Sequence, residues 1–284
     1  MYAKRLNSGR FFYSCTMAEQ SAPIGIFDSG IGGLTVAAAI HRLLPHENLI
    51  YVGDTAHFPY GDKSAGLIEQ YGVGITRYLL ERKCKMIVIA CNTASAYAFK
   101  AVQAVAGKDF PVVNVIDPAA EAIAKQFPEG KIGLIATRGT VSSGIYPRKI
   151  KKQAPKAEVT SLATPLLAPM IEEGFFNNKI SRTIIHSYLE KKSLQGIQAI
   201  ILGCTHYPLI RSEIESFYKG SITVFDSAEL VAQKVQNELR HSNLLLEGNE
   251  AKMEFYVSDY TESFAASAGY FFPEKVELKK LDLW

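Results

Sequence analysis

Short apolar segments rich in branched side chains alternate with helical patterns along most of the chain. One long helix is expected at about residues 64–84. Strands that alternate with helices predict an α/β fold, in which helices cover both faces of a mainly parallel sheet and make three layers. Four segments in the first half have the length and composition of buried strands: Pro23–Phe27, Asn48–Val52, Met86–Ile89 and Pro111–Ile116.

The pattern restarts in the second half of the chain. Lys131–Thr140 resembles Ile24–Gly30, because each is a strand followed by a glycine turn. Gln198–His206 resembles the segment around Cys91, because each is a strand that ends at a cysteine with a threonine close behind. The two matches have similar offsets along the chain, so we predict a duplicated α/β domain.

The repeat also suggests domain limits. We expect a first domain at residues 23–117 and 227–284 and a second at residues 118–226. Residues 1–22 are expected to form a flexible N-terminal extension, since their apolar run is shorter than that of a signal peptide. Met17 is an alternative initiator, and Pro165–Asn178 reads as a long connection between a strand and a helix.

Composition narrows the class of protein. The chain has 284 residues, 48% of them hydrophobic, and a net charge of +3. That charge is too small to indicate a nucleic-acid or membrane-surface partner. No apolar run approaches the ~18–20 residues of a membrane span. Four cysteines without a Cys-x-x-Cys pair indicate neither a zinc site nor a disulfide framework, and they favour a reducing compartment.

Two of these cysteines occupy equivalent places in the two halves. Cys91 and Cys204 each follow a strand, at the sheet edge where α/β proteins bind ligands. An isolated cysteine is more often a small buried hydrophobe. A pair that faces each other across an interdomain cleft, however, is what stereochemical inversion needs: one thiolate removes a proton and the other thiol returns one to the opposite face. A thiol pKa of about 8.5 suits both roles.

The neighbours of the two cysteines suit an amino-acid substrate. Asp28, beside Ser29, offers a carboxylate for an ammonium group or a base that assists Cys91. His206 is the natural partner of Cys204. Other side chains can bind carboxylate oxygens, although singly each is more often a helix cap: Asn92, Thr93 and Thr205. Two helix N-termini would stabilise the developing charge. No motif requires a metal or a Schiff-base cofactor.

A dinucleotide site is an alternative. Gly30-x-Gly32-x-x-Thr35 follows a strand and opens a helix, and Asp54 lies near the end of the next strand. The third glycine of the fingerprint is missing, and Asp28 would place a carboxylate next to a pyrophosphate. A two-domain binding protein without chemistry is a further alternative.

Several motifs together resemble the glutamate racemases, the cofactor-independent members of the aspartate/glutamate racemase superfamily. The resemblance extends over about residues 23–227. The motifs lie in the same order along the chain: Phe27–Leu34, Phe58–Gly61, Ala90–Ala94, Ala136–Thr140 and Leu202–Leu209.

This resemblance implies two pseudo-symmetric three-layer α/β domains, with the C-terminal segment returning to the first domain and the active site in the cleft. It implies interconversion of L- and D-glutamate without a cofactor, which supplies D-glutamate for peptidoglycan in a bacterial cytoplasm. Cys91 would act on the D-enantiomer and Cys204 on the L-enantiomer. The implied substrate contacts are Asp28, Ser29, Tyr60, Gly61, Asn92, Thr93, Thr205 and His206.

Further implications concern partners. Glu172 or Glu173 resembles a family glutamate near the second cysteine, and the two remain open alternatives. Relatives are commonly homodimers, so the resemblance implies a homodimer. Some relatives are activated by a peptidoglycan precursor, so the resemblance also makes such a precursor the candidate activator. The nearest alternative substrate is aspartate. The resting protonation of each thiol is also left open.

Overall fold

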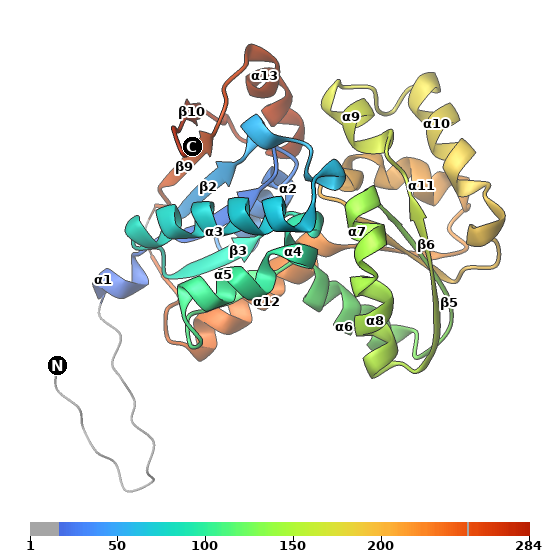
Figure 1. Ribbon diagram of the computed structural model, residues 1–284, viewed down its shortest axis with the longest axis horizontal. Coiled ribbons are helices and arrows are strands. Elements are labelled where there is room, and N and C mark those ends of the chain that lie inside the picture. The colour runs from blue at the N-terminus through green and yellow to red at the C-terminus, as the bar shows by residue number, and fades with distance from the viewer. Residues whose placement is uncertain (1–16, 249) are drawn as a thin grey trace, which may run out of the picture.

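Two parallel sheets, each covered by helices on both faces, make up the computed structural model (Figure 1). The structure describes residues 17–248 and 250–284. Every strand pair in these residues is parallel. The predicted fold class, α/β with mainly parallel sheets, is therefore confirmed.

The first sheet has six strands in the order β10-β9-β2-β1-β3-β4. Successive residues of β1 point to opposite faces: Ile26 packs in one core cluster with α2 and α12, and Phe27 in another with α3 and α5. Burial on both faces explains why the central strands are continuously apolar. The strands are β1 (Ile24–Asp28), β2 (Leu49–Gly53), β3 (Met86–Ile89), β4 (Val112–Asn114), β9 (Met253–Val257) and β10 (Leu278–Lys280).

The helices around the first sheet come from both ends of the chain. The long predicted helix is present as α3 and is somewhat shorter than expected. The α12 helix packs against both α2 and α6, so it lies between the two halves. The helices are α2 (Leu34–Leu43), α3 (Ala65–Glu81), α4 (Asn92–Tyr97), α5 (Phe99–Ala106), α12 (Ser227–His241) and α13 (Glu262–Phe271).

The second sheet has four strands in the order β6-β5-β7-β8. The edge strand β6 is half-exposed, and its weak apolar pattern gave no strand prediction. The region Pro165–Asn178, expected as a connection, contains the short helix α9. The elements are β5 (Glu129–Ala136), β6 (Lys156–Ala163), β7 (Ala199–Gly203), β8 (Thr223–Asp226), α6 (Ile116–Gln126), α7 (Arg138–Ser143), α8 (Ile145–Gln153), α9 (Leu167–Glu172), α10 (Lys179–Leu189) and α11 (Arg211–Phe217).

The last part of the chain returns to the first sheet. Strand β9 pairs with β2, with Leu49 opposite Met253, and β10 pairs with β9. Figure 1 shows β9 and β10 beside β2, on the side of the first sheet that lies away from the second sheet. The domain limits at residues 117–118 and 226–227 stay a prediction, which the course of these strands supports.

Two local predictions need correction. The strand expected at 111–116 ends at Asn114, because its side-chain Oδ1 accepts from the N–H groups of Ile116 and Asp117, 3.0 Å each, and starts α6 instead. The flexible extension was expected to reach residue 22, but residues 17–20 form α1 (Met17–Gln20). The Gln20 amide donates to the carbonyl of Asn243, 3.2 Å. Residues 1–16 lie outside the described residues.

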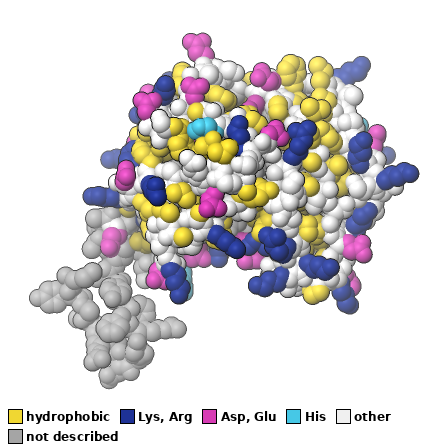
Figure 2. All heavy atoms as spheres, viewed as in Figure 1, with side chains coloured by type: hydrophobic (Ala, Val, Ile, Leu, Met, Phe, Trp, Pro, Cys, Tyr) yellow, Lys and Arg dark blue, Asp and Glu magenta, His cyan; other side chains and the backbone are white. Residues whose placement is uncertain are grey.

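The face drawn in Figure 2 carries both basic and acidic side chains, mixed with one another. Across residues 17–248 and 250–284, no helix has the length and apolar character needed to cross a membrane.

Candidate active site

A small cavity lies where the carboxyl ends of the two sheets meet. Its walls come from the loops after β1, β2 and β3 and from those after β5, β6 and β7. Its volume is about 30 Å³, room for roughly one water molecule. The structure brings together all but one of the predicted site residues on these walls: Ser29, Tyr60, Gly61, Cys91, Asn92, Thr93, Cys204, Thr205 and His206.

Cys91 reaches the cavity from the end of β3 and caps α4. Its Sγ accepts from the N–H of Ala94 at 3.4 Å, and its S–H donates to the hydroxyl of Ser29 at 3.6 Å. Burial, reinforced by the charge of Asp28, raises the pKa of Cys91 to about 12. The cap favours a thiolate, but burial outweighs it. The thiol form of Cys91 is therefore favoured in this environment.

Cys204 follows β7 and has a different environment. Its Sγ lies 3.6 Å from Nδ1 of His206, whose Nε2 lies 2.9 Å from Oε1 of Glu172. Burial lowers the pKa of His206, but the bonds to Cys204 and Glu172 outweigh burial and raise this pKa well above its usual value. A cationic imidazole stabilises a neighbouring thiolate. Of the two candidate glutamates, Glu172 makes this contact, while Glu173 is exposed.

The turn after Cys204 differs from the turn after Cys91. The chain continues into a 3₁₀ helix, η4 (Tyr207–Ile210), before α11 begins at Arg211. The prediction of an α-helix N-terminus at both cysteines is thus confirmed at Cys91 and wrong at Cys204. Pro208, in the first turn of η4, lacks the N–H of other residues, and the tighter turn places His206 beside the thiol.

Asp28 lies behind the cavity wall. It is fully buried, and its Oδ2 accepts from the N–H groups of Gly30 and Gly33 at 3.1 Å each. Burial raises the pKa of Asp28, although the charge of His206 and the two backbone bonds oppose that effect. Its Oδ1 has no hydrogen-bond partner among the described residues. Asp28 makes no bond to the Cys91 thiol, and only its ionised form disfavours a thiolate there.

The remaining polar side chains tie the two halves together at the cavity. The hydroxyl of Thr93 lies 2.9 Å from that of Thr137 and 3.1 Å from that of Thr140, both from the second half. Tyr146, also from the second half, donates to Oδ1 of Asn92 at 2.7 Å. That bond fixes the Asn92 amide, and its Nδ2 is buried without a partner among the described residues.

Tyr60 contributes its ring to the wall, since its hydroxyl is already occupied. The Tyr60 hydroxyl donates to Oδ2 of Asp54 at 2.6 Å. Burial and the Asp54 charge hold the pKa of Tyr60 far above its usual range. Five further residues line the cavity but were not predicted as site residues: Phe58, Pro59, Thr137, Ala168 and Gly203. Phe58, Pro59 and Thr137 could have been found, because they lie in motifs that carried the family resemblance.

The dinucleotide alternative is wrong. A Cβ on Gly32 would overlap the ring of His206, so the second half of the chain fills the space over the glycine turn. Asp54 is fully buried and accepts bonds from Tyr60, Ser258 and Trp284. Neither a pyrophosphate nor a ribose hydroxyl can reach these groups.

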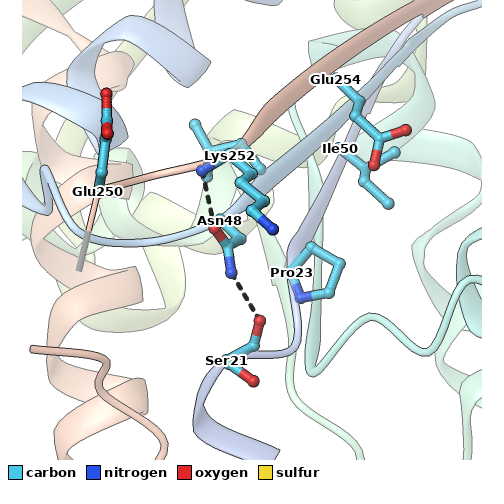
Figure 3. Close-up of a pocket in the computed structure, with 8 residues that line it drawn as sticks. Ser21, Pro23, Asn48, Ile50, Glu250, Lys252 and Glu254 are labelled. Carbon is cyan, nitrogen blue, oxygen red and sulfur yellow. Dashed lines mark hydrogen bonds between the residues drawn. The ribbon is translucent and has the colours of Figure 1, made fainter. Parts of the chain in front are cut away.

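A larger cavity lies at the opposite, amino end of the first sheet. Its volume is about 530 Å³, and Figure 3 shows Asn48 at its centre, bonded to Ser21 and Lys252. Its charged side chains are one lysine and the acidic Glu250 and Glu254. Its lining includes neither a cysteine nor a histidine, whereas the smaller cavity has two cysteines and a histidine, so we place the chemistry in the smaller cavity. Among the described residues, no cluster of three or more His, Cys, Asp or Glu side chains could hold a metal ion.

A parallel two-sheet fold with one thiol from each sheet at a shared cavity is the class of architecture expected of cofactor-independent racemases. The family model described as Asp/Glu/Hydantoin racemase matches residues 33–235. The chain belongs to this family.

Individual relatives sharpen the comparison. The chain is 42% identical to the glutamate racemase of Chlorobaculum parvum over 244 residues, which cover 86% of this chain and 89% of the relative. It superposes on a crystal structure of the Francisella tularensis glutamate racemase in complex with D-glutamate with a TM-score of 0.87 at 35% identity, covering 93% of this chain and 98% of that one. The Escherichia coli glutamate racemase, in complex with L-glutamate and the activator UDP-MurNAc-ala, gives a TM-score of 0.73 at 30% identity, covering 92% and 98%.

Proposed function

We propose that this chain is a glutamate racemase that interconverts L- and D-glutamate with two cysteines and no cofactor. The observation that carries the proposal is the pair of buried thiols, one from each sheet, on the walls of one cavity. Glutamate, as the substrate, is supported by relatives of that name that match most of the chain.

The two thiols differ in a way that suits opposite roles. In the L-to-D direction, Cys204 as a thiolate beside cationic His206 removes the α-proton. The electron pair of the C–H bond moves into the α-carboxylate, and the S–H of Cys91 gives its proton to the other face of the carbon. Cys204 ends as a thiol and Cys91 as a thiolate. The D-to-L direction reverses these steps.

The charge that develops on the α-carboxylate needs hydrogen-bond donors. The amide of Asn92 can supply one, because Asn92 lines the cavity. Its Nδ2 has no partner among the described residues, and the bond from Tyr146 to its Oδ1 holds the amide in place. Asp28, with its free Oδ1 behind the wall, opposes a resting thiolate at Cys91.

Proton exchange in D₂O tests this proposal. Each enantiomer of glutamate and of aspartate is incubated with the protein, and the α-proton signal is followed together with optical rotation. We expect inversion and deuterium uptake with glutamate. Deuterium uptake with aspartate alone would mean that aspartate, and not glutamate, is the substrate. Racemisation that survives Cys91→Ser would overturn the two-thiol mechanism. Absence of both activities alongside saturable ligand binding would instead favour a binding protein.

The assignment of each thiol has its own test. Cys91→Ser should retain residual exchange mainly with L-glutamate, and Cys204→Ser mainly with D-glutamate, because each keeps the thiol that deprotonates that enantiomer. Cys84→Ser is the matched control, since Cys84 is buried away from the cavity. The same enantiomer preference in both variants would contradict the assignment.

The proposal includes the wider role and the partners of the enzyme. We infer that it supplies D-glutamate for peptidoglycan in the cytoplasm, acts as a homodimer, and has two domains at residues 23–117 with 227–284 and at 118–226. A peptidoglycan precursor is the candidate activator, because one relative binds UDP-MurNAc-ala. Light scattering tests the dimer, and racemisation with and without that nucleotide tests activation.

A further inference from the structure

Trp284 lies against the loop that forms one wall of the cavity. Its indole N–H donates to Oδ1 of Asp54 at 3.0 Å. Its ring packs edge-on against His57 and Tyr71, with centroids 5.1 and 5.3 Å away. A Cβ on Gly74 of α3 would come within 2.8 Å of the indole, so the glycine leaves room for it. The contact is thus supported by α3 and by the loop after β2.

Asp54 collects bonds from distant parts of the chain. Besides Trp284, its carboxylate accepts from the hydroxyl of Ser258, 2.7 Å, and from that of Tyr60, 2.6 Å, and Nδ1 of His57 lies 3.0 Å from it. The carboxylate is fully buried, and a buried charge is tolerated only when its oxygens are bonded. The indole N–H is therefore one of a small set of donors that fix the carboxylate.

Fixing Asp54 also fixes the cavity wall. Tyr60 is only 1% exposed and is bonded to Asp54, and it belongs to the run Phe58–Gly61 that lines the cavity. A carboxylate that rotated would move the Tyr60 hydroxyl with it. A shift of this wall changes the space for substrate without touching either thiol.

We propose that Trp284 is a positioning residue of the active site, which through its bond to Asp54 holds Tyr60 and the Phe58–Gly61 wall in the geometry that binds substrate. This inference rests on the proposed function. It concerns binding, so it predicts a larger effect on KM than on kcat.

Trp284→Phe tests the bond itself, because phenylalanine keeps an aromatic ring and removes the donor. We expect KM for glutamate to rise roughly three- to tenfold, the change expected when one ordinary hydrogen bond is lost, with kcat changed less. Tyr71→Phe is the control, since its ring lies in the same cluster and its hydroxyl is not among the donors to Asp54. An unchanged KM in Trp284→Phe, or an equal rise in both variants, would overturn the inference.

Fluorescence gives a second readout that needs no variant. Trp284 is the single tryptophan of the sequence, so the emission of the intact protein reports this one contact. Titration with racemic glutamate keeps the composition constant during turnover, and we expect a saturable change in emission with a midpoint near KM. A signal that does not respond to glutamate would count against the inference.

The two proposals fail in different ways. A wild-type protein that does not turn over glutamate contradicts the proposed function and this inference with it. A wild-type protein that turns over glutamate, beside a Trp284→Phe variant with unchanged KM, contradicts this inference alone.

Discussion

His206 lies between Cys204 and Glu172, and its pKa depends on both. Burial alone would keep the imidazole neutral, yet the two bonds raise its pKa well above the usual value. The protonated imidazole of His206 lies beside the sulfur of Cys204, where it can stabilise a thiolate. The two thiols therefore have different environments, although the sequence presents them in similar motifs.

Glu172→Gln removes the charge that helps to keep His206 cationic. The pKa of His206 should fall, so the alkaline limb of the kcat/KM profile should move to lower pH. We expect kcat/KM to drop roughly 10- to 100-fold, because a hydrogen bond to a charged group contributes about 1.5–3 kcal/mol. Glu173→Gln, a change of the exposed neighbour, is the control. If the alkaline limb of the kcat/KM profile does not shift in Glu172→Gln, Glu172 does not keep His206 cationic.

Asp28→Asn keeps a buried polar side chain of the same size but removes the group that ionises. Asparagine can still accept from Gly30 and Gly33. Because burial raises the pKa of Asp28, folding favours its protonated form, and the associated stability is present at low pH and lost as pH rises through the raised pKa. The variant should therefore be more stable than the wild type near pH 8, and the gap in Tm should shrink towards pH 4. A gap that grows on acidification would mean a lowered pKa instead.

At the scale of elements, α13 connects the first sheet to the Glu172–His206 pair of the second half. Its Ser267 donates to the backbone carbonyl of Glu172 at 3.0 Å, and Phe271 packs edge-on against the His206 ring at 5.2 Å. One helix thus holds both ends of the Glu172–His206 bond. Although α13 comes late in the chain, it belongs to the environment of Cys204.

Ser267→Ala should loosen this support. Losing one hydrogen bond of about 1 kcal/mol corresponds to a roughly fivefold fall in kcat, with the alkaline limb moved in the same direction as in Glu172→Gln. Ser263→Ala makes the same change at an exposed position of the same helix and should leave kcat unaltered. Identical kinetics for the two variants would contradict a role of α13 in supporting Glu172.

The sequence predicts those elements that have a local pattern. The strand before Cys91 is visible as a branched apolar run. The helix cap was predicted at Asn92 or Thr93, but Cys91 itself caps α4. The half-exposed β6 lacks such a run. The choice between Glu172 and Glu173 depends on which side of a short helix faces His206, and adjacent residues leave that ambiguous. The bond from Trp284 to Asp54 joins residues far apart in sequence and has no local signal.

At the scale of the whole molecule, the small volume of the cavity sets a condition on substrate binding. A volume of about 30 Å³ leaves room for roughly one water molecule, which is less than glutamate needs. Several bonds between the two halves close it, among them Thr93 to Thr137 and Tyr97 to the carbonyl of Gly139 at 3.0 Å. We infer that the halves separate to admit substrate and close again upon it.

Hydrogen exchange can follow this movement. The Cys91→Ser variant binds without inversion, so exchange of α4 and α7 can be compared with and without glutamate. We expect slower exchange in both helices with glutamate, and a rise in unfolding free energy of about 2.7 kcal/mol at 100 times Kd. Aspartate at the same concentration is the control. Equal protection by both ligands would contradict specificity for glutamate.

The pairing of β9 with β2 has a consequence for synthesis on the ribosome. Leu49 pairs with Met253, so one edge of β2 has no partner until nearly the whole chain has been made. An apolar strand with a free edge is a hazard for mispairing. The second sheet, whose strands are consecutive in sequence, can be completed earlier. The bonds from Ser258 and Trp284 to Asp54, behind the cavity wall, are therefore among the last features of the nascent protein to form.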